Sequence, residues 1–278
     1  MGRKAIILGK KVVSRTETLK YASERFGWKN VAIGISCFFG FWAWVIGRLT
    51  GRKVIYYCID FYSPKVSINS KGWRRLFCFF AMLMDKFLVK HCDECWDISD
   101  RINHGRGTFG NYHAELSKIV PLSYPPSYFR FRENVWRNKV AFVGLDPYGL
   151  ELAKDIPGIE LEWLGGKPLI PLDELLDKLS LCGIGLSMWE EDGNNYYGDP
   201  GKTKLYSACG LPVIMTPNTP YARIINLTQA GIVIRYNRDS LEKAVKLMLN
   251  NYSYYKDNVP KTWRYINADI VCGSIGSW

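Results

Sequence analysis

One stretch, residues 198–214, constrains the fold more than any other part of the chain. It reads Gly-Asp-Pro-Gly-Lys-Thr-Lys-Leu-Tyr-Ser-Ala-Cys-Gly-Leu-Pro-Val-Ile. A Gly/Pro loop comes first, then about two turns of helix, then a Gly-Leu-Pro entry into an apolar strand. Lys202 and Lys204 lie where the loop becomes the helix, whose N-terminal N–H groups attract anions. Because lysine adds a mobile point charge, the stretch indicates a phosphate site on a β/α unit.

The rest of the chain alternates between strand-like and helix-like segments. Predicted strands cover 4–9, 30–36, 53–60, 94–99 and 118–122, then 139–144, 159–165, 183–188, 211–215 and 231–234. Predicted helices, besides the one in 198–214, cover 14–26, 38–49, 70–90, 147–155, 172–181, 221–229 and 239–250. Such alternation implies parallel sheets covered on both faces. The predicted fold class is therefore α/β with two doubly wound, Rossmann-like domains, whose ligands bind at the carboxyl ends of the strands.

A break in periodicity separates the two predicted domains. Residues 121–138 are rich in proline, aromatic and charged side chains, which is typical of a linker. The chain of 278 residues is long enough for two domains. We expect an N-terminal domain at 1–132 and a C-terminal domain at 133–278.

The charge and the cysteines limit the partners. The net charge of +11 indicates an anionic partner: a nucleotide, a nucleic acid or an acidic membrane surface. No nucleic-acid-binding motif is recognisable and the charge is spread out, so a nucleic acid is not expected. Eight irregularly spaced cysteines suit a reducing, cytoplasmic location. Cys92 and Cys95 follow His91 but lack a fourth ligand at suitable spacing, so no metal is expected.

Two apolar segments leave alternatives open. The run 31–47 lies at the short limit for a membrane span, but it also divides into a strand and a buried helix, which we favour. No signal peptide opens the chain, which agrees with a cytoplasmic protein. The helix 70–90 has an apolar side and several basic residues. It suits either peripheral contact with the inner face of an anionic membrane or a core position with a solvated basic side.

Several of these residues resemble a known family. The stretch 198–214 is similar to the donor-site signature of GT-B glycosyltransferases of the group 1, family 4 type. The matching positions are Pro200, Lys202, Tyr206, Ala208, Gly210, Pro212, Val213 and Ile214. The segments 55–62 and 92–99 resemble the first domain of a subset of these enzymes. The resemblance implies two Rossmann-like domains facing across a cleft. The first, at 1–132, would be a shortened acceptor-side domain, and the second, at 133–278, would bind the nucleotide-sugar. A final helix would pack back on the first domain.

The chain departs from the family in three places. Leu205 stands where the family has an acidic residue that holds the nucleotide ribose. The arginine and lysine that often follow the first strand of the second domain are replaced by Leu-Asp-Pro-Tyr at 145–148. The first half is also short for an acceptor domain, as if an initial β/α piece were missing.

The resemblance assigns roles to individual residues. Lys202, with Lys204 second, is expected to meet the charge that builds on the departing diphosphate, without a metal or other cofactor. The expected donor-binding set is Gly144, Lys167, Asp199, Gly201, Lys202, Thr203, Lys204 and Tyr206. Asp60, at a strand end, is expected to orient or deprotonate the acceptor, although it also fits a turn-initiating aspartate. Arg101 and Arg106 are expected to reach a phosphate of the donor or acceptor.

The resemblance implies one of two functions. The leading one is a hexosyltransferase that uses a nucleotide-sugar such as a UDP-sugar. A glycan or lipid-linked acceptor would receive the sugar with retention, in cell-surface polysaccharide or glycolipid synthesis. The alternative is a non-catalytic nucleotide- or sugar-binding protein derived from such an enzyme, which Leu205 and the short first half favour.

Overall fold

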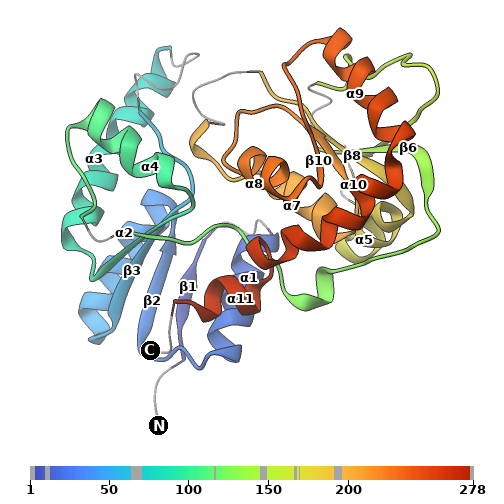
Figure 1. Cartoon of the computed structure of the whole chain (residues 1–278). Helices are drawn as coiled ribbons and strands as arrows, with labels where there is room; N and C mark the ends of the chain where they lie inside the picture. Colours follow the sequence, from blue (N-terminus) through green and yellow to red (C-terminus); the bar gives the residue numbers. More distant parts are fainter. Residues whose placement is uncertain are drawn as a thin grey trace. The chain divides into compact units, whose positions relative to one another are not determined.

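A computed structural model describes most of the chain as two compact units (Figure 1). The described residues are 4–9, 13–63, 71–115, 117–144, 149–165, 168, 170–190 and 196–275, with the side chains of residues 13–15 excepted. Unit 1 consists of residues 1–123, 192–199 and 268–278. Unit 2 consists of residues 124–191 and 200–267.

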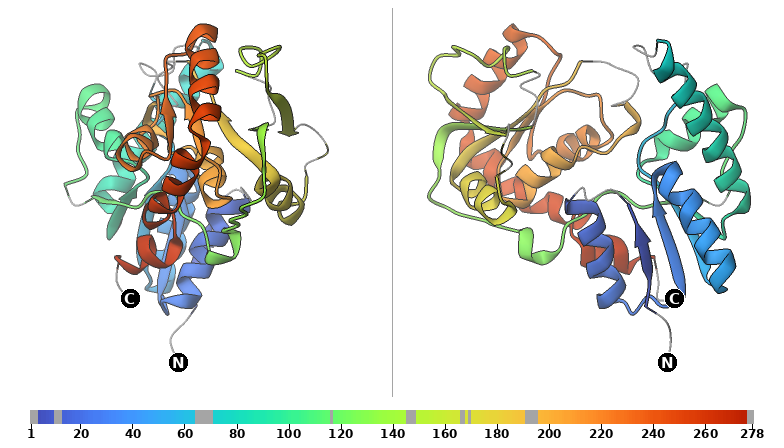
Figure 2. Two further views of the ribbon diagram at one scale, coloured as in Figure 1. Left: turned by 45° about the vertical axis from the view of Figure 1, so that its right-hand side comes forward. Right: turned by 180° about the vertical axis from the view of Figure 1, so that it is seen from behind.

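Unit 1 is built on a parallel five-stranded sheet, as predicted. Its strands lie in the order of the sequence: β1 (Ile6–Leu8), β2 (Val31–Ile35), β3 (Lys53–Cys58), β4 (Glu94–Asp97) and β5 (Ser117–Ile119). Its helices are α1 (Val13–Arg25), α2 (Ser36–Thr50), α3 (Trp73–His91), α4 (Asp100–Gly105) and α11 (Ala268–Gly273), with a π-helical turn at Arg106–Gly110. Helices α2 and α3 lie on one face of the sheet, and α1 lies with α11 on the other (Figures 1 and 2).

The apolar run 31–47 divides into strand β2 and helix α2, which confirms the prediction. Two glycines let α2 lie close against β3. A Cβ on Gly40 would come within 2.7 Å of the Tyr56 ring, and one on Gly47 within 2.3 Å of the Val54 side chain. None of the helices in the described residues is long and apolar enough to cross a bilayer.

Helix α3 turns only some of its apolar side chains toward the sheet. Cys78, Ala81 and Leu88 are buried, whereas the regularly spaced Leu76, Phe79, Phe80 and Leu83 are exposed. The two sets lie on opposite sides of a helix with 3.6 residues per turn. The apolar side seen in the sequence is therefore not the side that packs on the core.

Arg106 is the largest buried charged side chain in unit 1. Its Nε and Nη2 donate to Asp85 at 2.9 and 3.1 Å, and its Nη1 donates to Asp97 at 2.8 Å. The hydroxyls of Tyr56 and Tyr112 each donate to Asp85 at 2.6 Å. Burial favours a raised pKa for Asp85, but Arg106 and the two tyrosines outweigh it and hold that pKa below its ordinary value. Burial raises the pKa of Asp97.

Unit 2 contains a second parallel sheet, again as predicted. The strand order is β10 (Gly231–Val233), β9 (Val213–Met215), β8 (Cys182–Ser187), β6 (Trp136–Gly144) and β7 (Glu160–Gly165). The helices are α5 (Leu172–Leu181), α7 (Gly201–Ala208), α8 (Tyr221–Thr228), α9 (Arg238–Asn250) and α10 (Tyr252–Asn258), with 3-10 turns at Pro126–Tyr128 and Val259–Tyr265.

Strand β8 is packed on both faces of this sheet. Ile184 and Leu186 join the apolar core that α9 covers. Gly185, which lies between them, faces the opposite side, because successive positions alternate along a strand. There a Cβ on Gly185 would come within 2.4 Å of the Tyr206 ring, so glycine lets α7 lie directly on the strand.

One predicted helix of unit 2 is wrong. Residues 149–155, the described part of the predicted helix 147–155, form turns. Gly149 and Asp155 have φ angles of +85° and +60°, which a right-handed helix does not contain.

Replacing Arg106 with leucine should destabilise the protein strongly. The change leaves Asp85 and Asp97 buried without their counter-charge, which costs on the order of 3–5 kcal/mol. The measurement is the free energy of unfolding in urea. Arg238→Leu, which breaks an exposed pair with Glu242 at 2.9 Å, is the matched control and should cost about 0.5 kcal/mol or less. Equal losses in the two variants would contradict this account of the buried network.

Candidate functional site

The segment 198–214 forms the predicted loop, helix and strand in unit 2. Helix α7 begins at Gly201, directly after Pro200, and strand β9 begins at Val213. No side chain caps the N-terminus of α7, which leaves its first N–H groups for a ligand. The side chains from Thr203 to Ala208 are all buried. The packed body of the helix thus fixes the position of its N-terminal turn.

Tyr206 joins α7 to two strands. Its hydroxyl accepts a hydrogen bond from the Val143 N–H at 2.7 Å and donates to the Leu186 carbonyl at 3.1 Å. Both partners lie one residue before the end of their strand, β6 and β8 respectively. The helix is therefore held at the carboxyl ends of the strands, where ligands of doubly wound sheets bind.

A short chain of hydrogen bonds fixes the first turn of α7. Thr203 Oγ1 lies 2.6 Å from the Oγ of Ser187, the last residue of β8. The indole Nε1 of Trp189 donates to the same Ser187 oxygen at 3.3 Å. Helix α7, strand β8 and the indole of Trp189 are thereby linked through one hydroxyl.

Lys202 lies between two aromatic rings at this edge of the sheet. Its Nζ is 4.4 Å from the ring centroid of Phe142 and 4.1 Å from that of Trp189. No carboxylate pairs with it within the part of the chain that the structure describes. Burial lowers the pKa of Lys202 from 10.5 to about 8. An anion bound here would supply the counter-charge that the ammonium group lacks.

The remaining predicted residues of unit 2 lie around this turn. The Gly201 carbonyl accepts a hydrogen bond from the Tyr124 hydroxyl at 2.7 Å. Lys204 is buried, with its Nζ 5.4 Å from the ring centroid of Tyr221. Lys167 falls outside the described residues.

Gly144 ends strand β6 beside Gly165, the last residue of β7. A Cβ on Gly165 would come within 1.7 Å of the Gly144 carbonyl oxygen, so the two strand ends approach as only glycine allows. The same oxygen accepts a hydrogen bond from the Trp163 indole at 2.9 Å. The carbonyl of Gly144 is thus held by Trp163 at the carboxyl edge of the sheet.

The structure places three predicted residues of unit 1 in separate surroundings. Asp60 is half-buried, two residues after β3, and contributes with burial to a raised pKa of Tyr62. Asp199 is buried and accepts a hydrogen bond from the Leu122 N–H at 2.8 Å. Arg101 donates to the Tyr196 carbonyl at 3.0 Å and lies over its ring.

Arg106 is fully buried and bonded to two carboxylates, as described above. Its donors are directed at Asp85 and Asp97, so we leave it out of the phosphate site proposed below. Arg101 remains a prediction.

Sequence reasoning missed the aromatic surroundings of Lys202. Phe142 belongs to a buried strand and gave no signal of its own. Trp189 lies two residues after the end of β8, at the carboxyl edge of the sheet where ligands bind. That position is the signal that could have identified it.

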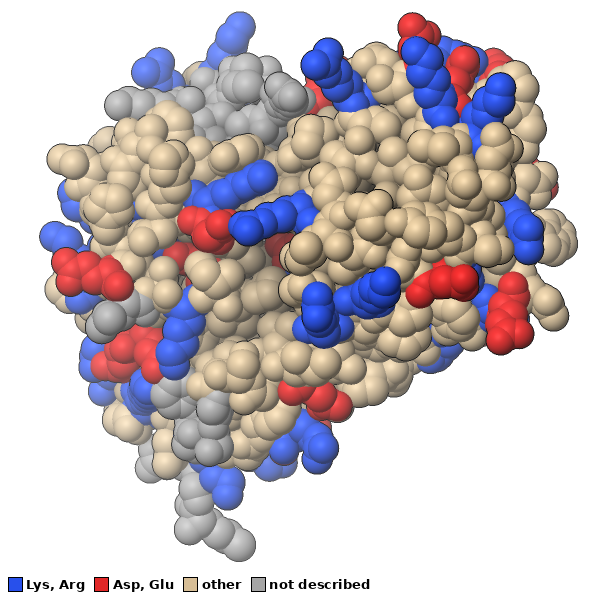
Figure 3. Space-filling view, in the orientation of Figure 1, with Lys and Arg blue, Asp and Glu red and all other residues tan. Residues whose placement is uncertain are grey.

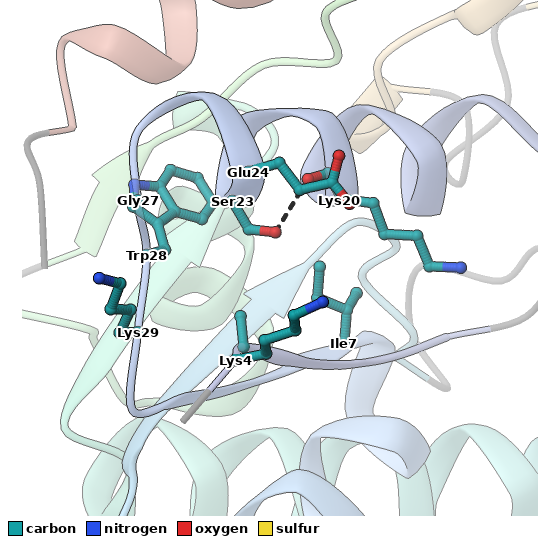
Figure 4. A pocket seen from close by; sticks show the side chains of 9 residues that line it. Lys4, Ile7, Lys20, Ser23, Glu24, Gly27, Trp28 and Lys29 are labelled. Atoms are coloured by element: carbon teal, nitrogen blue, oxygen red, sulfur yellow. Dashed lines mark hydrogen bonds between the residues drawn. The ribbon is translucent and has the colours of Figure 1, made fainter. Parts of the chain in front are cut away.

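A pocket of about 480 Å³ lies elsewhere, in unit 1 (Figure 4). Lys4 and Ile7 come from the β1 side, and Ser23 and Glu24 come from α1 opposite them. Lys4 precedes β1 and Lys29 precedes β2, so the pocket lies at the amino ends of these strands. This is the edge of a doubly wound sheet that ligands ordinarily do not use.

Comparison with known proteins gives similarity at the level of fold. No protein-family model and no curated protein matches the chain. Sucrose-phosphate synthase from Thermosynechococcus elongatus matches 96% of this chain and 78% of its own, with a TM-score of 0.67 and 12% identity. HepE from Anabaena, solved with UDP, matches 93% and 80%, with a TM-score of 0.65 and 11% identity.

A third structure is the lipopolysaccharide outer core galactosyltransferase WaaB, in its apo form. It matches 94% of this chain and 78% of its own, with a TM-score of 0.54 and 12% identity. The two parallel sheets, the helix α7 at the carboxyl edge of the unit 2 sheet and these similarities agree: the chain has the two-Rossmann-domain GT-B fold of these glycosyltransferases.

Proposed function

We propose that this protein is a glycosyltransferase that moves a hexosyl group from a nucleotide-diphosphate sugar to a glycan or lipid-linked acceptor. The observation that carries the proposal is Lys202, a cation without a carboxylate partner in the described residues, beside the uncapped N-terminus of α7. Both features attract a diphosphate. We take the donor to be a UDP-sugar, because HepE, which shares the fold, was solved with UDP and with UDP-glucose.

Glycosyl transfer needs its largest electrostatic support at the leaving group. As the bond between the anomeric carbon and the diphosphate oxygen breaks, negative charge builds on that oxygen. The Lys202 ammonium and the N–H groups at the start of α7 are fixed before the reaction and meet this charge without reorganising. Neither group requires a metal, and we propose a reaction without one.

The acceptor side of the reaction is simpler. The acceptor hydroxyl oxygen forms the new bond to the anomeric carbon. In a reaction that retains configuration, its proton passes to the departing phosphate oxygen. No side chain then has to act as the base, and we propose that Asp60 orients the acceptor hydroxyl through a hydrogen bond.

A binding protein without transfer activity is the second candidate. Leu205 is 7% exposed and apolar, so this position offers no carboxylate to a nucleotide ribose. Release of UDP from UDP-glucose separates the candidates: continuous release in the presence of acceptor requires an enzyme, whereas binding without release identifies the alternative.

The distribution of charge favours a small anionic ligand over a nucleic acid. On the face drawn in Figure 3, Lys and Arg are interspersed with Asp and Glu. A nucleic-acid backbone is bound by a stripe or patch of one sign, with many phosphates neutralised at once. A single pair of phosphates needs only a local cation such as Lys202.

Nucleotide binding should stabilise the protein and depend on Lys202. UDP at a hundred times its dissociation constant adds about 2.7 kcal/mol of native stability, which raises the melting temperature by roughly 5–10 °C. Thermal unfolding with UDP, GDP, ADP and CDP measures the shift and identifies the base.

Lys202→Ala should weaken binding by roughly ten- to a hundredfold, as expected for losing a hydrogen bond to a charged group. Lys243→Ala, on the exposed side of α9, is the matched control and should bind as the wild type does. An unchanged shift in Lys202→Ala would remove the basis of the proposal.

The affinity for UDP should fall at alkaline pH. Only the ammonium form of Lys202 attracts the diphosphate, and its pKa is about 8. Affinity should therefore weaken about tenfold between pH 7 and pH 9, because the protonated fraction falls by that factor. Isothermal titration calorimetry measures it.

Two controls accompany this pH series. In Lys202→Arg the side chain keeps its charge throughout, because arginine does not deprotonate in this range, so the affinity of this variant for UDP should not change with pH.

The stability of the free protein should change with pH in the opposite direction. The pKa of Lys202 is lower in the folded than in the unfolded state, so the free energy of unfolding should rise between about pH 8 and pH 10.5. A pH-dependent affinity in Lys202→Arg equal to that of the wild type would assign the titration to another group.

A further inference from the structure

Helix α3 presents large apolar side chains to solvent. Its apolar face consists of Trp73, Leu76, Phe79, Phe80 and Leu83, of which Trp73 is 80% and Phe80 is 52% exposed. Soluble proteins scatter single exposed apolar side chains, but a contiguous group of this kind marks an interaction surface.

The neighbouring helix extends this surface. Phe77 of α3 stacks on Phe38 of α2, with ring centroids 5.3 Å apart, so the two helices are joined along their exposed edge. Trp42 of α2 is 59% exposed. Figure 2, right, shows α2 and α3 side by side on the face of the sheet that α1 leaves uncovered.

The charges around this face select an anionic occupant. Helix α3 carries Arg74, Arg75, Lys86 and Lys90, and its only acidic residue is Asp85. Asp85 is buried against Arg106 and offers nothing to the surface. The charges that α3 itself presents to solvent are therefore positive.

Two of the arginines lie where they oppose the helix dipole. Arg74 and Arg75 are exposed in the first turn of α3, which contains no acidic residue. Positive side chains are unfavourable beside the positive end of a helix unless anions neutralise them. Trp73 lies in the same turn, and tryptophan is the side chain enriched where a bilayer meets water.

We propose that the apolar face of α3 docks on an anionic lipid surface. The helix would lie in the plane of the headgroups, with Phe79, Phe80 and Leu83 entering the acyl boundary and Arg74 and Arg75 meeting lipid phosphates. A second copy of the chain fits less well, because pairing two such faces brings their basic borders together. The proposal does not rest on the glycosyltransferase assignment, since it concerns a surface of unit 1 and needs no nucleotide.

Vesicle co-sedimentation of the full chain, without nucleotide or acceptor, tests the proposal. The chain should pellet with vesicles of phosphatidylcholine mixed with phosphatidylglycerol, but not with phosphatidylcholine alone, and high salt should weaken the binding. Arg74→Gln with Arg75→Gln should lower the partition coefficient about 25-fold, from about 1 kcal/mol for each basic side chain near an anionic surface. Trp73→Ser with Phe80→Ser should lower it at least about tenfold.

Matched controls come from unit 2. Lys243→Gln with Lys246→Gln removes the same charge from α9, and Leu227→Ser with Leu247→Ser removes two exposed leucines. Both should bind as the wild type does. All these side chains are exposed, so each variant should fold, and a thermal unfolding transition like that of the wild type verifies this.

Three outcomes would overturn the proposal. The wild type stays in the supernatant with both kinds of vesicle, or the unit 2 controls lose as much binding as the α3 variants do. The third is a dimer in analytical ultracentrifugation that Trp73→Ser with Phe80→Ser abolishes while lipid binding persists, which would make the face an interface between copies.

Discussion

The two hydrogen bonds of the Tyr206 hydroxyl hold the proposed phosphate site together. One reaches the end of β6 and the other the end of β8, so a single buried side chain sets the position of α7 against two strands. Gly185 permits this contact, because any Cβ there would collide with the Tyr206 ring. The anchor thereby fixes the start of α7 and Lys202 against β6, which contains Phe142, and β8, which Trp189 follows.

The position of Lys202 destabilises its charged form but also suits it to bind an anion. An ammonium group between two aromatic rings keeps an attractive contact but loses much of its hydration, which is why its pKa falls to about 8. A bound diphosphate would restore the missing electrostatic stabilisation. Such a site is poised for an anion in the same way that a buried carboxylate is poised for a cation.

The order of elements was predictable because both sheets are parallel and buried, so each strand is a short apolar run with clear boundaries. The signature helix and the division of 31–47 into β2 and α2 were predicted on this basis. The segment 149–155 was not, because the positive φ of Asp155 depends on its local fold and leaves no mark on the apolar pattern. Lys202 was predicted from its motif, whereas its neighbours Phe142 and Trp189 come from distant positions that only tertiary structure brings together.

The surroundings of two sets of side chains could not be predicted from the sequence pattern. The apolar stripe of α3 has the spacing of a core-facing side, yet the sheet receives Cys78, Ala81 and Leu88 instead. Periodicity identifies an apolar side but not what covers it. Arg106 was likewise predicted to reach a phosphate, but Asp85 of α3 and Asp97 of β4 accept its hydrogen bonds. Burial of a charge depends on such partners, which a linear motif does not contain.

A crystal structure of the protein with UDP tests the central claim most directly. The account predicts the diphosphate at the N-terminus of α7, within hydrogen-bonding distance of Lys202 Nζ and of the first N–H groups of the helix. Lys202 should then make a charged hydrogen bond in addition to its contacts with Phe142 and Trp189. UDP bound elsewhere, for example in the lysine-lined pocket beside β1, with the N-terminus of α7 unoccupied, would contradict it.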